Sequence, residues 1–399
     1  MDTLISRFKR RINSVSTSIV RDCIEQVAWD ERLSAIVGPR GVGKTTLILQ
    51  YIKTNYTDDL SEVLYVTMEE LYFSNHTLSE LADLFVLHGG KHLFLDEIHR
   101  YPGWSREIKL IYDTYSDLKV TISGSSLLQI LNSEADLSRR CITFNMQGLS
   151  FREFLHFYKD IQLPSVTLDD ILHNPDPLCN QVNNVCRPVK MFHEYLQYGY
   201  FPYYLKGGVR YHERICNIVD YVIATELPMV CRVETANIRK LQVLLSVVAG
   251  LVPYELDISK LASMLQISRN TVMAYLNHMH RAKIINLLYA DVSSLKKVQK
   301  PDKIYLENPN MLYALTLDKT HIGTARETFA VNQFAYRHRI EYGKKAGDFR
   351  IDGKYCLEVG GSGKSYDQIA DIPDSYILAD DTEYPTGNKI PLWTVGFMY

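Results

Sequence analysis

Short apolar runs alternate with longer stretches of helical or polar character along the first part of the chain. The runs lie at residues 33–37, 63–67, 92–95, 120–123 and 141–144. Runs of this length, separated by segments long enough for a helix, are typical of strands in a parallel sheet with helices on both faces. The pattern therefore predicts an α/β fold, preceded by a helical segment over residues 1–30.

The first run leads directly into a glycine-rich segment, and a stretch with helical periodicity follows at 47–52. Strand, glycine-rich loop and helix in this order are typical of a phosphate-binding loop, in which backbone N–H groups and the helix N-terminus surround the phosphates. We expect Lys44 to reach the β- and γ-phosphates of ATP and the Thr45 hydroxyl to bind Mg²⁺. The residues expected to bind the nucleotide are Gly38, Pro39, Arg40, Gly41, Val42, Gly43, Lys44, Thr45 and Thr46.

The third run ends in two adjacent acids, Asp96 and Glu97. An apolar strand that delivers carboxylates at its C-terminal end is typical of the second half of a nucleoside triphosphatase site. We expect Asp96 to hold Mg²⁺ through water, and Glu97 to polarise the attacking water as the catalytic base.

Two further catalytic candidates follow the fourth run. Ser125, with Ser126 as the second choice, would contact the γ-phosphate and the attacking water if its strand lies beside that of Asp96, although small residues here also suit a simple turn. Arg139 or Arg140 would stabilise transition-state charge, in the same chain or in a second copy of it, or would form a surface salt bridge.

These segments, together with Leu149–Phe154, resemble the AAA-type ATPase domain of a large group of uncharacterised bacterial and archaeal ATPases. The aromatic segment Tyr195–Leu205 is similar to the segment that follows that core. The resemblance implies a P-loop NTPase core of the additional-strand type, with the strand of Ser123 between the P-loop strand and the strand of Asp96. It also implies a C-terminal domain related to restriction endonucleases.

Four domains follow from this interpretation: the ATPase domain at 1–150, a helical lid at 151–235, a winged-helix segment at 236–295 and a nuclease-like α/β domain at 296–399. Within the lid we expect a polar loop at Asn174–Pro188. The aromatics of Tyr195–Leu205 suit an apolar core better than a platform for stacking bases.

Residues 236–295 carry the pattern of a helix-turn-helix. Apolar spacing predicts a helix at 258–265 and a second helix at 269–281, with Ser268 as its N-cap and a strand at 284–289 after it. This arrangement favours a winged-helix segment that binds DNA or serves as a protein-interaction or packing module. The side chains that the second helix would expose are Arg269, Asn270, Asn277 and His278.

The last hundred residues contain a helical pattern to about Arg337 and two strand patterns joined by Asp352-Gly353, which favours a hairpin turn. Strand alternation puts Asp348 and Glu358 on one face, where they would bind a divalent ion with support from Glu327. A nuclease of the restriction-endonuclease type has a lysine at the position of Gly360, and the next lysine here is Lys364. We therefore expect a docking surface that binds metal without cleaving nucleic acid.

Composition limits the partners. The 399 residues have a formal net charge of −2, so nucleic-acid binding would need a local patch. The basic cluster at 7–11 offers either a solvated helix face or such a patch. The seven cysteines include no C-x-x-C pair, which indicates reduced thiols in the cytoplasm. The longest apolar stretch, at 241–252, is too short to cross a bilayer.

We interpret the chain as a cytoplasmic AAA-type ATPase that uses ATP and Mg²⁺, with no membrane partner. Its nucleotide cycle would control C-terminal domains that bind DNA or protein, and a second copy of the chain is a candidate partner. The alternatives are a slow nucleotide-gated switch and an ATP-regulated, metal-dependent nuclease.

Overall fold

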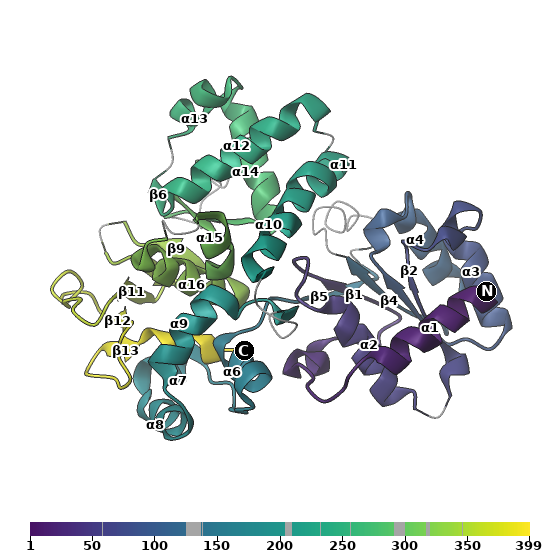
Figure 1. Ribbon diagram of the computed structural model, residues 1–399, viewed down its shortest axis with the longest axis horizontal. Helices are drawn as coiled ribbons and strands as arrows, with labels where there is room; N and C mark the ends of the chain where they lie inside the picture. Colours follow the sequence, from purple (N-terminus) through teal and green to yellow (C-terminus); the bar gives the residue numbers. More distant parts are fainter. Residues whose placement is uncertain are drawn as a thin grey trace. The chain divides into compact units, whose positions relative to one another are not determined.

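The computed structural model describes residues 1–57, 59–124, 137, 139–203, 210–231, 233–255, 257–290, 300–316, 320–344 and 346–399 (Figure 1). These residues form two compact units, Met1–Gly148 and Leu149–Tyr399, called unit 1 and unit 2 below. No described helix is long and apolar enough to cross a membrane.

Unit 1 is a parallel five-stranded sheet of order β2-β3-β4-β1-β5. Helices α1 and α2 lie on one face and α3 and α4 on the other (Figure 1). Every residue of β1, β2 and β3 is buried, which explains their uninterrupted apolar sequences. The elements are α1 (Asp2–Ser14), η1 (Asp22–Gln26), β1 (Leu33–Val37), α2 (Lys44–Asn55), η2 (Leu60–Glu62), β2 (Val63–Thr67), η3 (Leu71–Ser74), α3 (Leu78–Leu87), β3 (His92–Asp96), η4 (Ile98–Arg100), α4 (Trp104–Thr114), β4 (Lys119–Gly124) and β5 (Ile142–Asn145).

The sheet order confirms the predicted position of β4 between β1 and β3. Because all these strands are parallel, their C-terminal ends meet at one edge of the sheet, where open α/β sheets place their ligand sites. The glycine-rich segment after Val37, the acids after Leu95 and the end of β4 therefore come together at this edge.

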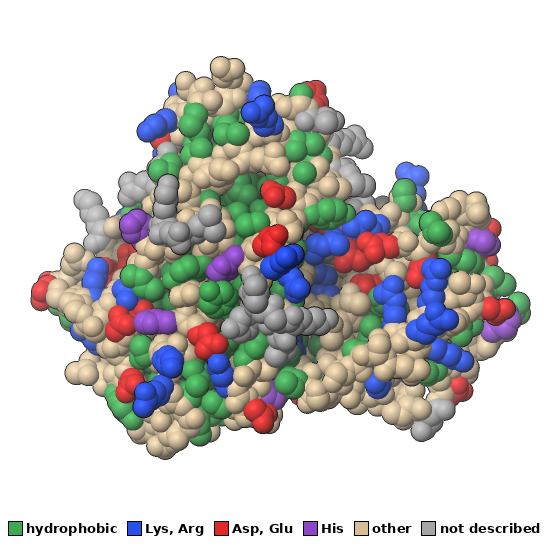
Figure 2. Space-filling view, in the orientation of Figure 1, with side chains coloured by type: hydrophobic (Ala, Val, Ile, Leu, Met, Phe, Trp, Pro, Cys, Tyr) green, Lys and Arg blue, Asp and Glu red, His purple; other side chains and the backbone are tan. Residues whose placement is uncertain are grey.

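The helix predicted over residues 1–30 is wrong beyond Ser14. The chain turns extended at Val15, and side chains of α2 satisfy the carbonyls that follow. Gln50 Nε2 donates to the carbonyls of Ser16 and Ile19, each at 2.8 Å. These bonds replace the helical ones, so the segment packs on α2 without being helical. The basic cluster of α1 is exposed apart from the half-buried Arg11, and Figure 2 shows basic side chains along this helix.

Unit 2 combines helices with two sheets, of order β6-β8-β7 and β13-β12-β11-β10-β9. Its elements are α6 (Phe151–Lys159), α7 (Leu168–His173), α8 (Asp176–Val185), α9 (Pro188–Tyr198), α10 (Tyr211–Tyr221), η7 (Val222–Glu226), α11 (Leu227–Cys231), α12 (Thr235–Leu251), β6 (Tyr254–Glu255), α13 (Ile258–Leu265), α14 (Arg269–Arg281), β7 (Ile285–Leu288), β8 (Lys303–Leu306), α15 (Pro309–Thr316), α16 (Ile322–Arg337), β9 (Ile340–Tyr342), β10 (Phe349–Ile351), β11 (Tyr355–Gly360), β12 (Ser375–Ala379), β13 (Lys389–Pro391) and η10 (Leu392–Phe397).

Helices α6–α9, which we expected to belong to a lid, share one apolar core with the C-terminal sheet. The rings of Phe192 in α9 and Phe329 in α16 pack edge to face, with centroids 4.8 Å apart. Tyr195 and Tyr200 are almost completely buried, which confirms that the aromatic segment contributes to a core. The first half of unit 2 is therefore packed against its last strands.

One further expectation for unit 2 is wrong. The segment Asn174–Pro188 contains helix α8 instead of a polar loop, because Leu178, Cys179 and Val182 recur at helical spacing and are buried. Residues 361–374, all of them described, follow the hairpin without a helix or a strand.

The helix-turn-helix elements match their predicted bounds in α13 and α14, and the Ser268 hydroxyl caps α14 by accepting from Thr271 N at 3.0 Å. Strands β7 and β8 pair antiparallel after α14, and β6 pairs with β8 on its other side.

A buried histidine connects the central strands of unit 1. His92 Nε2 lies 2.8 Å from Thr121 Oγ1, and Nδ1 lies 3.0 Å from the Tyr56 hydroxyl. Thr121 Oγ1 in turn lies 2.9 Å from Ser34 Oγ, so the chain of polar groups runs from β3 through β4 to β1. Burial, followed by the charge of Lys119, lowers the pKa of His92 to about 3.

We predict that unit 1 loses stability in mild acid through His92. In the unfolded chain a histidine gains a proton below about pH 6.5, whereas folded His92 stays neutral to about pH 3. The unfolded state therefore binds more protons in this window, and each pH unit below 6.5 should cost roughly 1.4 kcal/mol. Denaturant unfolding between pH 7 and 4 should show a shallower loss in His92→Gln than in the native chain.

The exposed His88 of the same unit provides the control. His88→Gln should keep the acid-dependent loss of the native chain. Equal pH profiles for the native chain and His92→Gln would contradict the prediction.

Candidate nucleotide site

The glycine-rich loop after β1 needs glycine for two separate reasons. Gly41 and Gly43 have φ values of 89° and 100°, a region that side chains disfavour. At Gly38 the constraint is space, because a Cβ atom there would lie 2.1 Å from the Met146 carbonyl oxygen. Replacing Gly38 would therefore push the loop away from the segment that follows β5.

Two cations hold the loop. Lys44, the first residue of α2, is buried, and its ammonium donates to the carbonyls of Gly38 and Pro39 at 2.8 and 2.9 Å. The buried guanidinium of Arg21 donates to the Gln147 carbonyl at 2.7 Å and lies 3.4 Å from the Val42 carbonyl. Lys44 thus binds the start of the loop, and Arg21 connects the loop to the segment that follows β5.

The carboxylate of Asp96 is buried and accepts hydrogen bonds on both oxygens. Oδ2 accepts from the Thr45 hydroxyl at 2.7 Å and from the Tyr65 hydroxyl at 2.6 Å. Oδ1 accepts from the Ser123 hydroxyl and from Glu97 N, the latter at 3.2 Å. The structure therefore brings Thr45 and Asp96 together, and their oxygens are of the type that Mg²⁺ prefers.

Glu97 stands in the left-handed region with φ of 55°, which is uncommon for a residue other than glycine. Such backbone conformations concentrate at functional sites. The Glu97 carboxylate is 16% exposed, and its Oε2 lies 3.4 Å from Nε2 of the buried His99. The side chain is thus partly accessible at the strand end and has a neighbour that restricts its position.

The structure gives different outcomes for the remaining catalytic candidates from the sequence. Ser125 and its second choice, Ser126, lie outside the described residues. Arg140 pairs with Asp113 of α4 at 3.1 Å, and Arg139 is exposed. For Arg140 the contact that the structure contains is the salt bridge, which was one of the two expectations.

Sequence reasoning missed four side chains at this site: Arg21, Tyr65, His99 and Ser123. Ser123 was recoverable, because the pairing of Leu95 with Ile122 in the parallel sheet places the next residue of β4 beside Asp96. The roles of Tyr65 and His99 depend on where side chains of neighbouring elements point, which no local pattern encodes.

A second group of acids lies on the C-terminal sheet of unit 2. Phe349 pairs with Leu357, so the register sets Asp348 opposite Glu358, on the predicted common face. Val359 N donates to Asp348 Oδ2 at 2.9 Å, and the Tyr305 hydroxyl donates to Glu327 Oε2 at 2.7 Å. Burial and then the Glu327 charge raise the pKa of Asp348 to about 6.

Lys364 fills the space beside Gly360. A Cβ atom at Gly360 would lie 3.0 Å from Cβ, Cγ and Cδ of Lys364, so the stem of the lysine packs directly on the glycine. Its ammonium lies 2.5 Å from Glu358 Oε1. The side chain of Lys364 therefore occupies the space that a side chain at Gly360 would fill.

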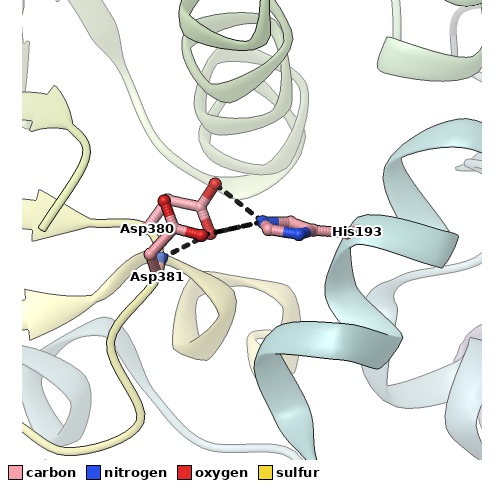
Figure 3. A group of neighbouring side chains, drawn as sticks. All are labelled: His193, Asp380 and Asp381. Carbon is pink, nitrogen blue, oxygen red and sulfur yellow. Dashed lines mark hydrogen bonds and ion pairs between the residues drawn. The ribbon is translucent and has the colours of Figure 1, made fainter.

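Figure 3 shows a third charged group, in which His193 of α9 faces Asp380 and Asp381 after β12. Among the described residues this is the one group of three His, Cys, Asp or Glu side chains whose ligand atoms lie within 4.8 Å of one another. Arg326 also donates to both acids, at 2.7 and 2.8 Å. The hydrogen bond to Asp380 raises the pKa of His193. Arg326 and His193 thus partner the two carboxylates, and the group is explained as a network of ion pairs and hydrogen bonds.

A parallel sheet of this order, with a glycine-rich loop before α2 and acids after β3, defines a P-loop nucleoside triphosphatase fold for unit 1. Residues 30–155 match the family described as an AAA domain, and residues 189–321 match a domain of unknown function. Unit 1 therefore contains an AAA-type P-loop ATPase domain.

Among curated proteins the chain is similar to two uncharacterized proteins of Methanocaldococcus jannaschii. It is 25% identical to MJ1637 over 315 residues and 24% identical to MJ1544 over 322 residues, in each case 75% of this chain and 66% of the relative. The chain thus covers slightly less than two thirds of the length of these relatives.

Among solved structures, the Walker-type ATPase PABY2304 of Pyrococcus abyssi aligns with 13% identity over 74% of this chain and 93% of that chain, at a TM-score of 0.42. AMPPCP-bound DnaA from Aquifex aeolicus aligns with 14% identity over 66% of this chain and 86% of that chain, at a TM-score of 0.26.

Proposed function

We propose that the protein binds ATP with Mg²⁺ and hydrolyses it at the edge of the unit 1 sheet. The observation that carries this proposal is the 2.7 Å contact between the Thr45 hydroxyl and the Asp96 carboxylate. It joins the phosphate-binding loop to the acid-bearing strand in one oxygen-rich site. Lys44 and the loop N–H groups would hold the phosphates, and Thr45 and Asp96 would hold the metal.

Glu97 is the proposed catalytic base. It follows Asp96 directly, is partly exposed, and carries the carboxylate that would take the proton of the attacking water. The bound metal would neutralise charge that develops on the phosphate oxygens. Arg139 remains a candidate for charge stabilisation in a second copy of the chain, because it is exposed.

The nucleotide cycle would act on unit 2, whose helices α12–α14 and strands β6–β8 follow the element order of a winged helix. The exposed N-terminal turn of α14, with Arg269 and Asn270, is the surface that we propose to contact DNA. A protein partner at the same surface is the alternative. Helices α6–α9 would transmit the change as part of the unit 2 core, in place of an independent lid.

A second candidate function is metal-dependent cleavage of nucleic acid by unit 2. The specific observation in its favour is the position of Lys364, which lies over Gly360 and reaches Glu358. The missing lysine was the reason to expect metal binding without cleavage, and Lys364 supplies a cation at the same place. Asp348 and Glu358 would hold the metal, and Lys364 would stabilise charge at the phosphate.

For the ATPase we predict that Lys44→Ala abolishes nucleotide binding, because it removes the buried ammonium group that would contact the phosphates. Glu97→Gln should retain binding and lose turnover by a factor of about 10² or more, since the metal site survives and the base does not. Steady-state phosphate release and equilibrium binding of an ATP analogue measure the two effects. Glu62→Gln, an exposed pair with Lys91 on the same unit, is the control that should keep turnover. Equal loss of nucleotide affinity in the Lys44 and Glu97 variants would contradict the role given to Glu97.

For DNA we predict weak, strongly salt-dependent binding, because the net charge is −2 and only local phosphate contacts are available. Arg269→Ala should weaken binding and reduce the slope of log affinity against log salt by about one. Arg210→Ala removes an exposed arginine at the N-cap of α10 and should leave both quantities unchanged. Absence of DNA binding at all salt concentrations would favour a protein partner.

For the second candidate function, cleavage of nucleic acid, we predict that supercoiled DNA is nicked with Mg²⁺ or Mn²⁺. Lys364→Ala should abolish this nicking. Lys354→Ala, on the exposed turn of the same hairpin, should leave it intact. Nicking that persists in Lys44→Ala would assign the cleavage to unit 2. If the native chain shows no nicking, the second candidate function is wrong.

A further inference from the structure

Tyr65 of β2 connects the N-terminal helix to the acid-bearing strand. Parallel pairing sets Tyr65 beside Phe94, and Asp96, two residues further along β3, faces the same side of the sheet. The Tyr65 hydroxyl donates to Asp96 Oδ2 at 2.6 Å. The side chain is 2% exposed, so water does not offer this hydroxyl an equivalent partner.

Arg11 of α1 is the second hydrogen-bond partner of the Tyr65 hydroxyl. Arg11 NH1 lies 3.3 Å from the Tyr65 hydroxyl, and a guanidinium can only donate. The phenol therefore accepts from Arg11 and sends its own proton to Asp96.

The anchoring of α1 supports the same arrangement. Arg7 pairs with Glu70, which lies just after β2, and Arg11 NH2 lies 4.0 Å from the second oxygen of Glu70. Leu4, Phe8 and Ile12 of α1 are buried, and Arg11, three residues after Phe8, lies at the edge of their stripe. Arg11 thus stands on a packed helix, and its half-exposed side chain contacts both Tyr65 and Glu70.

We propose that Tyr65 is a positioning residue for the Asp96 carboxylate and that Arg11 of α1 orients its hydrogen bond. The proposal rests on the proposed ATP hydrolysis and adds a residue outside the glycine-rich loop and the strand-end acids. Tyr65 and Thr45 hold Oδ2, and Ser123 holds Oδ1, so the plane of the carboxylate is fixed. Without Tyr65 the Thr45 hydroxyl is the one side chain left on Oδ2, so the orientation of the carboxylate toward the metal is less restricted, while the glycine-rich loop stays intact.

The test is Tyr65→Phe, which removes only the hydroxyl. The Mg²⁺ concentration for half-maximal ATP turnover should rise about tenfold, the factor typical of one hydrogen bond to a charged group. A titration of Mg²⁺ against a bound fluorescent ATP analogue should show the same shift without any turnover. Affinity for the analogue in EDTA should stay unchanged, because the loop and Lys44 are not altered.

Tyr56→Phe is the matched control. It also removes a tyrosine hydroxyl of unit 1, the one that contacts His92, and it does not touch Asp96. It should leave the Mg²⁺ dependence at the native value. Arg11→Met should shift the dependence in the same direction as Tyr65→Phe but by less, because the phenol remains.

The outcomes separate this inference from the function on which it rests. Equal Mg²⁺ dependence in Tyr65→Phe and Tyr56→Phe overturns the positioning role even if the native chain hydrolyses ATP. Loss of analogue affinity in EDTA also overturns it, since Tyr65 would then support the loop itself. A native chain that binds the analogue without turnover contradicts the proposed hydrolysis, whereas the binding titration still decides the role of Tyr65.

Discussion

The carboxylate of Asp96 is the group on which the unit 1 site depends. A buried carboxylate must have hydrogen-bond donors, because its removal from water otherwise costs several kcal/mol. Here the donors come from α2, β2 and β4 as well as from the next residue of the chain. Satisfying one charge therefore fixes three neighbouring elements relative to β3, and the phosphate-binding loop acquires its place through Thr45.

The same edge of the sheet imposes a steric constraint on the backbone. Gly38 approaches the Met146 carbonyl so closely that no side chain fits, and Arg21 joins the loop to the segment after β5. The loop is therefore shaped by contacts on both sides before any ligand binds. Preorganisation of this kind suits a site that must hold phosphate oxygens with fixed N–H groups.

Unit 2 contains two different clusters of buried charged residues. Around Asp380 the carboxylates are paired with Arg326 and His193, which accounts for the cluster as a structural link between α9, α16 and the end of β12. Around Asp348 the acids outnumber the cations, and burial together with Glu327 raises the pKa of Asp348. An excess of carboxylates at a strand pair is the feature that distinguishes a candidate metal site from an ion-pair network.

The sequence by itself determined the five strands of unit 1, the glycine-rich loop and the helices of the helix-turn-helix, because each is specified by local periodicity or by glycine. It also determined that Asp348 and Glu358 share a face, since strand alternation around a hairpin is local. Helix α8 has a local signal in the spacing of Leu178, Cys179 and Val182, which the polar residues around it concealed. The end of α1 at Ser14 was decided by a side chain distant in the sequence, Gln50, which binds the carbonyls that follow. Tyr65, His99 and the position of Lys364 over Gly360 likewise required the tertiary structure, because they depend on which side chains meet across neighbouring elements.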